Sequence, residues 1–256
     1  MNERPNDRNR ELEGKVALVT GSARNIGQAI AEELARAGAA VVINAVQAQT
    51  RCNEVAAGIE ANGGRALPVL ADIRCSEDVE RLVARTVETF GGIDILVNNA
   101  AVRNNIDFTE LAFEDWEALR AVALDGAFRV SMACVPHMVQ RGGGAIVSIH
   151  GLNSYTGSGA HRSAVKDGMA GMARGMASDL GQHGITSNVA VVGPFDTERA
   201  GSSGAMTVPN RHPDIPLGRR GIPQDMADLV RFLVGPYAQF ITGQTIHLNG
   251  GALMPH

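Results

Sequence analysis

The sequence has few cysteines, few aromatic residues and no long apolar run. Its three cysteines, Cys52, Cys75 and Cys134, are odd in number and fit neither a disulfide framework nor a metal site. Free thiols of this kind are typical of a reducing compartment, so we expect a cytoplasmic protein without a bound metal. No apolar stretch reaches the roughly 18 residues that a membrane-spanning helix needs, so no membrane partner is expected.

Positive charge is also scarce, and lysine is the scarcest source of it. The net charge of −4 at pH 7 gives no reason to expect a nucleic-acid partner. Among 23 basic residues only Lys15 and Lys166 are lysines, which favours a role for Lys166 that arginine would not fill. The first twelve residues are polar and lack the apolar segment of a signal peptide. We therefore predict a flexible tail over residues 1–12 and a single domain over residues 13–256.

Apolar runs of strand length alternate with segments of helical periodicity along the chain. The predicted strands cover residues 16–20, 41–44, 66–71, 93–98, 145–150, 187–192 and 245–248, and the predicted helices cover residues 25–37, 50–61, 76–90, 113–138 and 160–180. Continuous Val/Ile/Leu strands separated by helices are typical of a parallel sheet covered on both faces. The sequence thus predicts a doubly wound, Rossmann-like α/β fold, which binds ligands beyond the carboxyl ends of its strands.

The first turn of this fold, residues 20–27, reads Thr-Gly-Ser-Ala-Arg-Asn-Ile-Gly. It follows a strand and opens a helix, which is the context that a pyrophosphate site requires. Gly21 allows a tight turn and Gly27 a close approach of helix and strand, while Asn25 tolerates a positive φ in place of glycine. The pattern favours a dinucleotide site over a plain tight turn. Its predicted contacts are Gly21, Ser22, Arg24, Asn25 and Ile26.

The second strand ends in Asn44-Ala45-Val46, where an acidic residue would hold the ribose 2′-hydroxyl of NAD. No acidic residue is present there. Arg24 is able to bind a 2′-phosphate through charge-assisted hydrogen bonds, and so is Arg51. This favours NADP over NAD; the alternative is that both arginines are solvated surface charges.

Further motifs complete a pattern that resembles the short-chain dehydrogenase/reductase family from residue 14 to residue 253. They are Ala71-Asp72-Ile73, Asn98-Asn99-Ala100-Ala101, the segment 188–197, Ile241-Thr242-Gly243-Gln244 and Asn249-Gly250-Gly251. The resemblance implies an NADP-dependent oxidoreductase that acts on a small carbonyl/alcohol pair. It places the cofactor against Asn44, Asp72, Ile73, Asn99, Ala100, Ala101, Lys166, Gly193 and Thr197.

The family's catalytic group is Asn, Ser, Tyr and Lys, with the tyrosine four residues before the lysine. Lys166 fits, but Arg162 stands at the tyrosine position, His150-Gly151 at the serine and Ala123 at the asparagine. Arginine stays charged and cannot donate the proton. The candidates for a non-standard acid–base group are therefore His161, His150 and Tyr155, any of which is equally compatible with a structural role.

Two rival hypotheses stay open. The first rival to the oxidoreductase is a nucleotide-binding protein without redox activity, serving a structural or regulatory role. The second is a non-redox enzyme, such as a lyase or isomerase, on the same scaffold. A test with NADPH and a panel of carbonyl compounds separates them.

Two segments carry further expectations. Met169, Met172, Met176 and Leu180 form a helical stripe typical of packing. The resemblance implies that the equivalent helices pair between subunits, so we expect a homo-oligomer, and specifically a tetramer. Residues 198–216 show no periodicity and are expected to cover the substrate, with Met206 and Val208 as an uncharged surface.

Overall fold

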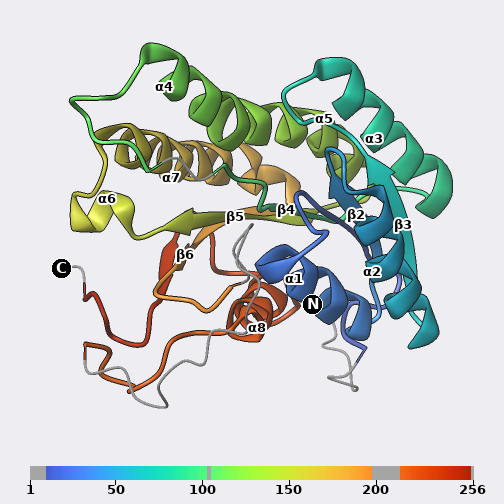
Figure 1. The fold of residues 1–256 in the computed structure, drawn as a ribbon. Coiled ribbons are helices and arrows are strands. Elements are labelled where there is room, and N and C mark those ends of the chain that lie inside the picture. Colours follow the sequence, from blue (N-terminus) through green and yellow to red (C-terminus); the bar gives the residue numbers. More distant parts are fainter. Residues whose placement is uncertain (1–9, 103–104, 198–213, 255–256) are drawn as a thin grey trace.

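A seven-stranded parallel sheet with the strand order β3-β2-β1-β4-β5-β6-β7 forms the centre of the computed structural model (Figure 1). The structure describes residues 10–102, 105–197 and 214–254. The strands are β1 Val16–Val19, β2 Ala40–Ala45, β3 Arg65–Leu70, β4 Ile95–Asn98, β5 Gly144–Gly151, β6 Ile185–Val192 and β7 Thr245–Leu248. The predicted doubly wound α/β fold is confirmed.

Helices cover both faces of the sheet. They are α1 Asn25–Arg36, α2 Gln49–Ala61, α3 Ser76–Phe90, α4 Phe113–Arg120, α5 Ala127–Gln140, α6 Asn153–Thr156, α7 Ala160–Leu180 and α8 Pro223–Val234, with the π-helical η1 Ala121–Gly126 and the 3₁₀-helical η2 Gly181–His183. Helices α1, α2 and α8 pack on one face, and α3, α5 and α7 on the other (Figure 1). Successive strand residues serve the two cores alternately: Ala17 and Val19 belong to the first, and Leu18 to the second.

The winding reverses between β1 and β4. The chain runs outward from β1 through β2 to β3, then returns to place β4 on the other side of β1. The loops that follow β1 and β4 therefore lie at the strands' carboxyl ends on either side of the reversal, where open α/β sheets bind their ligands; we call this region the crevice. Both sequence motifs that were predicted to bind a dinucleotide begin at this edge.

Several helical features differ from the prediction, including the short α6 and η2, which were not predicted. The expected single helix over residues 113–138 is divided by the π-helical segment η1. The spacing of apolar residues that predicted the helix does not reveal such a segment. Ile73 packs against η1 at Gly126, where an added Cβ would lie 2.8 Å from the Ile73 side chain. Helix α8 was missed, although Pro223 stands at its first turn and the Asp225 carboxylate accepts the Ile222 N–H at 2.8 Å.

The described part of the N-terminal segment is packed against the domain, which corrects the expected tail boundary at residue 12. Leu12 is 2% exposed, and its N–H donates to the Ala37 carbonyl at 2.8 Å. Glu11 forms an ion pair with Arg231 of α8 at 3.0 Å. Residues 10–12 therefore belong to the domain because they complete its apolar core and its ion-pair network; residues 1–9 lie outside the described part.

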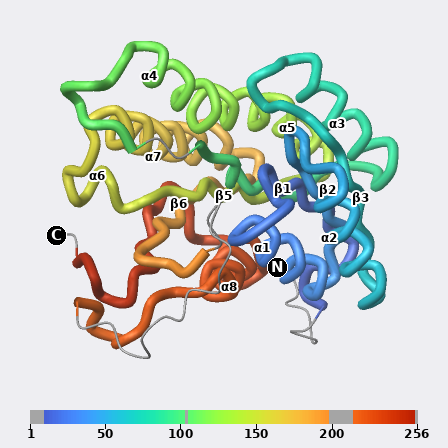
Figure 2. The backbone as a smooth tube through the Cα atoms, in the orientation of Figure 1, coloured from blue at the N-terminus to red at the C-terminus, as the bar shows by residue number. Residues whose placement is uncertain are grey.

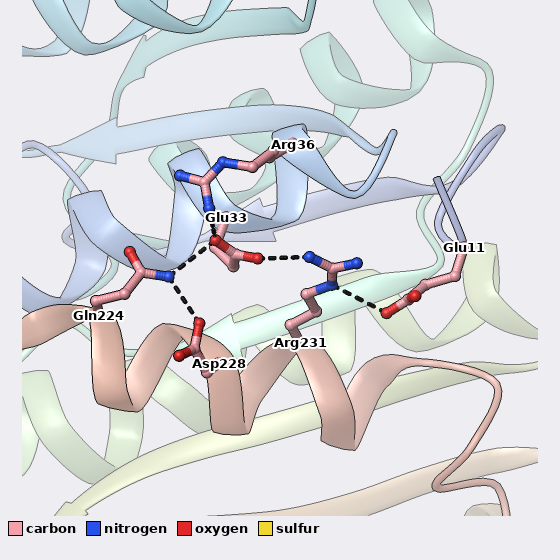
Figure 3. Close-up of polar contacts among 6 residues, drawn as sticks. All are labelled: Glu11, Glu33, Arg36, Gln224, Asp228 and Arg231. Carbon is pink, nitrogen blue, oxygen red and sulfur yellow. Dashed lines mark hydrogen bonds and ion pairs between the residues drawn. The ribbon is translucent and has the colours of Figure 1, made fainter. Parts of the chain in front are cut away.

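Helices α1 and α8, far apart in the sequence, lie side by side and are joined by buried charges (Figures 2 and 3). Arg231 donates to Glu33 at 2.7 Å and to Glu11 at 3.0 Å, while Gln224 donates to Glu33 at 2.8 Å. The exposed Arg36 also pairs with Glu33. Burial alone would raise the pKa of Glu33, but the hydrogen bonds from Arg231 and Gln224 and the charge of Arg36 together hold that pKa below its ordinary value.

We predict that Arg231→Met lowers the free energy of unfolding by about 3–5 kcal/mol, because it leaves the buried Glu33 and Glu11 without their shared cation. Arg36→Met is the matched control. Its side chain is 62% exposed, and its loss should cost less than about 1 kcal/mol. Urea denaturation measures both. Equal effects of the two substitutions would contradict the prediction.

The same pair of variants should differ in their pH dependence. A carboxylate with a lowered folded-state pKa contributes stability above its unfolded value of about 4.5, and this contribution is lost as pH falls through the lower folded value. The slope of stability against pH below 4.5 should therefore flatten in Arg231→Met and stay close to the parent's in Arg36→Met.

Candidate active site

The turn after β1 has the backbone that the sequence predicts. Gly21 adopts φ +63°, and Asn25, with φ +52°, is the only non-glycine residue of the described chain in the left-handed region. Ser22 is fully buried: its hydroxyl donates to the Val19 carbonyl at 2.7 Å and accepts the Asn44 N–H at 3.0 Å. The Ser22 side chain thus fixes the turn and leaves backbone groups to meet a ligand.

Asn44, at the end of β2, supports this turn from below. Its side-chain oxygen accepts the Gly21 N–H at 3.3 Å, and its amide nitrogen donates to the carbonyls of Val69 and Ala71 at 3.3 and 3.1 Å. Because both ends of the amide are bonded inside the protein, Asn44 is a positioning residue in this structure. Direct contact of Asn44 with a cofactor stays a prediction.

The loop after β4 touches the turn directly. The Asn99 side chain donates to the carbonyls of Thr20 and Gly21, both at 2.9 Å, while the Thr20 hydroxyl accepts the N–H groups of Asn99 and Ala100. A Cβ added at Gly27 would lie 2.4 Å from the Asn99 amide nitrogen and 2.5 Å from the Gly21 carbonyl oxygen. The close approach that was predicted for Gly27 is therefore present, and only glycine fits.

The remaining predicted cofactor contacts surround this turn. Arg24, Arg51 and Ala101 are exposed, and Ile26 is half-buried against the core of α1. Asp72 forms an ion pair with Arg74 at 2.6 Å, and the hydrogen bonds from that arginine lower the pKa of the Asp72 carboxyl.

Three other predicted contacts lie at neighbouring loop positions. Ile73 is buried, and its carbonyl accepts a hydrogen bond from Arg129 at 3.1 Å. Gly193 follows β6 and lies against Asn249, whose Cα would be 2.5 Å from an added Cβ. Thr197 is half-buried at the end of the same segment. Residues 198–213, including Met206 and Val208, lie outside the described part of the chain, so the expected cover is not placed.

Lys166 and His150 meet where β5 ends. The Lys166 ammonium donates to the Ile149 carbonyl at 3.1 Å and lies 3.6 Å from the Met169 sulfur. Desolvation by burial lowers the pKa of Lys166 to about 8. Burial, and then the charge of Lys166, lowers the pKa of His150 to about 4. His150 is 2% exposed, so a neutral imidazole lies beside a cation that titrates close to neutrality.

The tautomer of His150 follows from its surroundings. Its Nδ1 lies 2.7 Å from the Gly151 carbonyl, which only accepts hydrogen bonds, so Nδ1 carries the proton. Its Nε2 is buried and has no partner among the described residues.

Tyr155 and His247 extend this cluster, and sequence reasoning gave His247 no role. The Tyr155 ring lies 5.9 Å from the His150 ring and 4.4 Å from the His247 ring, between centroids. His150 and His247 are both in register with Val191 across β5, β6 and β7, so their side chains share one face of the sheet. Burial raises the pKa of the Tyr155 hydroxyl. Strand pairing is the signal that finds His247, and it is absent from a linear sequence.

His161 is buried but lies on another face of α7. It shares its helical row with Val165 and Met169, which pack with Leu119 and Ala123 of α4 and η1. Lys166 instead shares a row with Ala170, which packs on β6. Both ring nitrogens of His161 are without partners among the described residues. Five helical residues correspond to a rotation of about 140°, so His161 and Lys166 leave α7 in different directions, and a catalytic role of His161 stays a prediction.

Arg162 does share the row of Lys166, one turn earlier on α7. Its guanidinium donates to the Asn105 side chain, in the loop after β4, at 2.6 Å. Ala123, where the resemblance places an asparagine, lies buried inside the π-helical η1. The site thus joins the β1 turn, the β4 loop, the end of β5 and the first turns of α7.

The described residues contain neither a metal-binding group nor a membrane-spanning helix. No group of three or more His, Cys, Asp or Glu side chains there is arranged to hold a metal ion. None of the helices in that part of the chain is both long enough and apolar enough to span a membrane.

Comparison with known proteins finds relatives that span almost the whole chain. A family model described as enoyl-(acyl carrier protein) reductase matches residues 21–252. A 3-oxoacyl-(acyl-carrier-protein) reductase of Synechocystis is 36% identical over 246 residues, which cover 95% of this chain and 98% of that protein. The corresponding reductase FabG of Aquifex aeolicus is 34% identical and covers 94% and 98%.

Solved structures agree with these sequence relatives. A dehydrogenase/reductase from Sinorhizobium meliloti has a TM-score of 0.87 and 37% identity, covering 96% of this chain and 97% of its own. A short-chain dehydrogenase from Burkholderia cenocepacia in complex with NADP has a TM-score of 0.86 and 36% identity, covering 94% and 99%.

We predict that Gly27→Ala destabilises the fold by about 1–3 kcal/mol, because its methyl group would overlap the Gly21 carbonyl and the Asn99 amide. Gly58→Ala is the matched control. Gly58 lies in α2 with nothing within 4 Å of an added Cβ, so alanine there should stabilise by about 0.5–1 kcal/mol. Thermal and urea denaturation measure both changes. A neutral Gly27→Ala would show that the contact at the turn relaxes freely.

Proposed function

Because the chain belongs to the short-chain dehydrogenase/reductase family, we propose that it is an NADP-dependent oxidoreductase that interconverts a carbonyl compound and an alcohol. The observation that carries the proposal is the burial of Lys166 against the carboxyl end of β5, the strand next to β4. The relatives named 3-oxoacyl reductases support the reductive direction and a ketone as substrate. What differs from the family is the proton donor, which is not a tyrosine.

The residues of the crevice fit NADP. Gly27 lets the N-terminus of α1 pack directly against the β1 turn, and a helix N-terminus that opens at such a turn favours a pyrophosphate group. The end of β2 carries no carboxylate to hold a free ribose 2′-hydroxyl, and Arg24 is exposed beside the turn, so a 2′-phosphate is favoured. The Burkholderia neighbour with bound NADP supports this choice. When bound, NADPH supplies the hydride; Gly21, Arg24, Asn25, Asp72 and Asn99 are the residues that hold or surround it.

Lys166 is the group that we assign to proton transfer. Efficient proton transfer needs a pKa near the working pH, and the Lys166 pKa is about 8. His150, with a pKa of about 4, is neutral at pH 7 and is a poor proton donor. The pKa of Tyr155 is raised away from neutrality, and Arg162 stays charged. In reduction Lys166 donates its proton to the carbonyl oxygen, and in oxidation the neutral amine accepts it back.

His150 has a supporting role in this proposal. A neutral ring beside Lys166 shields the amine from water and adds no charge that would compete with it. The position of Lys166 is held by the Ile149 carbonyl, which accepts its hydrogen bond. The three side chains that the sequence offered as proton donors, His161, His150 and Tyr155, are thereby ranked behind Lys166.

The face of α5 and α7 supports assembly of subunits. Phe128 and Met132 of α5 are 51% and 62% exposed, and with Met172 and Met176 of α7 they line one shallow hollow. Met169, the first residue of the predicted stripe, is instead buried within the subunit. We propose that this apolar face pairs with a second copy, and that a tetramer forms by family resemblance.

A double substitution tests the assembly. Phe128→Asp with Met132→Asp should reduce the molar mass seen by light scattering toward the 26.9 kDa of one chain, because charge on this face opposes burial. Phe108→Asp, which is 70% exposed in the turn between β4 and α4, should leave the mass unchanged. A parent protein that is monomeric at micromolar concentration would refute the assembly.

The oxidoreductase itself is tested by NADPH consumption with a panel of ketones, compared with NADH. The rate with NADPH should exceed that with NADH. It should be constant below pH 8 and fall about tenfold per unit above it, since only the protonated Lys166 donates. Absence of turnover on every ketone, with NADPH binding retained, would favour the nucleotide-binding or non-redox alternatives.

Two variants separate the proton donors. Lys166→Arg keeps the charge but cannot release a proton, so turnover should fall by about 10²–10⁴-fold with NADPH affinity reduced far less. His161→Gln should keep most of the turnover, because His161 lies about 140° around the axis of α7 from Lys166. The assignment of Lys166 fails if Lys166→Arg stays active, or if the high-pH fall in rate persists in that variant.

A further inference from the structure

Arg162 occupies a position in the crevice where the fold has no internal use for most of its guanidinium. It lies in the first turn of α7 and reaches across to Asn105 in the loop after β4. We propose that Arg162 binds a free carboxylate on the carbonyl substrate, so that the substrate class is an oxo acid and its hydroxy-acid product. This inference rests on the proposed function and names its substrate class.

The first support is an unsatisfied donor. A guanidinium offers five N–H donors, of which Nη1 serves Asn105. The Nε atom of Arg162 is buried and has no acceptor among the described residues. Buried donors without partners are rare and costly, and each one calls for an explanation. A rotation of the Arg162 side chain that brings this N–H to a ligand oxygen would satisfy it.

The second support is uncompensated charge. Several arginines of the described chain form ion pairs with carboxylates, as Arg231 does with Glu33 and Arg219 with Asp225. Arg162 forms no such pair with any described residue, and its neighbour one turn on, Lys166, donates only to a carbonyl oxygen and a sulfur. Two cations on one helical row, in a chain of net charge −4, favour an anion between them and the opposite loop.

The third support is the space that the chain leaves for this side chain. Gly159 adopts φ +76°, and a Cβ there would lie 2.5 Å from the Arg162 Nε and 2.8 Å from its Nη2. A side chain at position 159 would displace the guanidinium from this position. The glycine turn before α7 and the Arg162 guanidinium are therefore in direct contact.

The chemistry of the fork selects a carboxylate. The planar guanidinium matches two carboxylate oxygens through parallel hydrogen bonds, which an ester or thioester cannot reproduce with equal strength. Arg162 therefore gives a reason for the loss of the tyrosine: the position holds the substrate's acid group, and proton transfer passes to Lys166 on the next turn.

Calorimetric titration tests this with three oxo acids, pyruvate, acetoacetate and levulinate, each against its methyl ester. The protein is used both alone and saturated with NADP⁺, so that the result does not depend on turnover. At least one acid should bind the parent on the order of 10–100-fold more tightly than its ester. Equal binding of acids and esters, or no binding of any acid, would overturn the inference.

Two substitutions assign the effect to the guanidinium. Arg162→Gln should abolish the preference for the acid, whereas Asn105→Ala, which removes the loop contact and keeps the charge, should retain it. Equal losses in both variants would mean that Arg162 only positions the loop, and would overturn the inference. If Arg162→Gln does not fold, Arg162→Lys replaces it, with a reduced preference expected because the planar fork is lost.

The two proposals fail in different ways. Binding of the acid through Arg162 without NADPH consumption would refute the oxidoreductase and support the carboxylate site. NADPH consumption together with equal binding of esters and acids would support the oxidoreductase and refute the carboxylate site.

Discussion

The contact between the β1 turn and the β4 loop is the constraint on which the site depends. Gly27 brings the N-terminus of α1 against the Gly21 carbonyl, and Asn99 donates to Thr20 and Gly21 from the other side. These bonds lock together two loops that the reversal of the sheet would otherwise send apart. Because the two backbones nearly touch, the loops that border the crevice are held in fixed positions. The strands that precede these loops determine which side chains lie at the crevice.

The candidate catalytic residues come from the second half of the chain, from β5 and α7. Strand β5 ends at His150, and α7 returns over it with Arg162 and Lys166 on one helical row. Burial disfavours both an ammonium and an imidazolium, so the cluster holds one cation that titrates near neutrality and one ring that stays neutral. The roles that we propose, a fixed cation for Arg162 and a titrating one for Lys166, rest on the difference between guanidinium and amine.

Much of the fold follows from local patterns. Every strand of the sheet was predicted to within two residues at each end, because fully buried parallel strands read as continuous apolar runs. Helix α8 was missed because a proline at its start also signals a loop, and η1 was missed because π-helical pairing changes no residue type. Asn44 was expected to meet a ligand; in the structure its amide nitrogen donates to the carbonyls of Val69 and Ala71, and its side-chain oxygen accepts the Gly21 N–H, so its direct contact with a cofactor stays a prediction.

The sequence by itself determined the glycine turn, the missing carboxylate after β2, and the spacing of Arg162 and Lys166, since each depends only on neighbours along one element. Tertiary structure decided which side chains meet. It placed His247 beside Tyr155 through strand register and linked Arg162 to Asn105. The physical reason is that pKa values and partners arise from contacts between elements distant in the chain, and burial is a property of the packed whole.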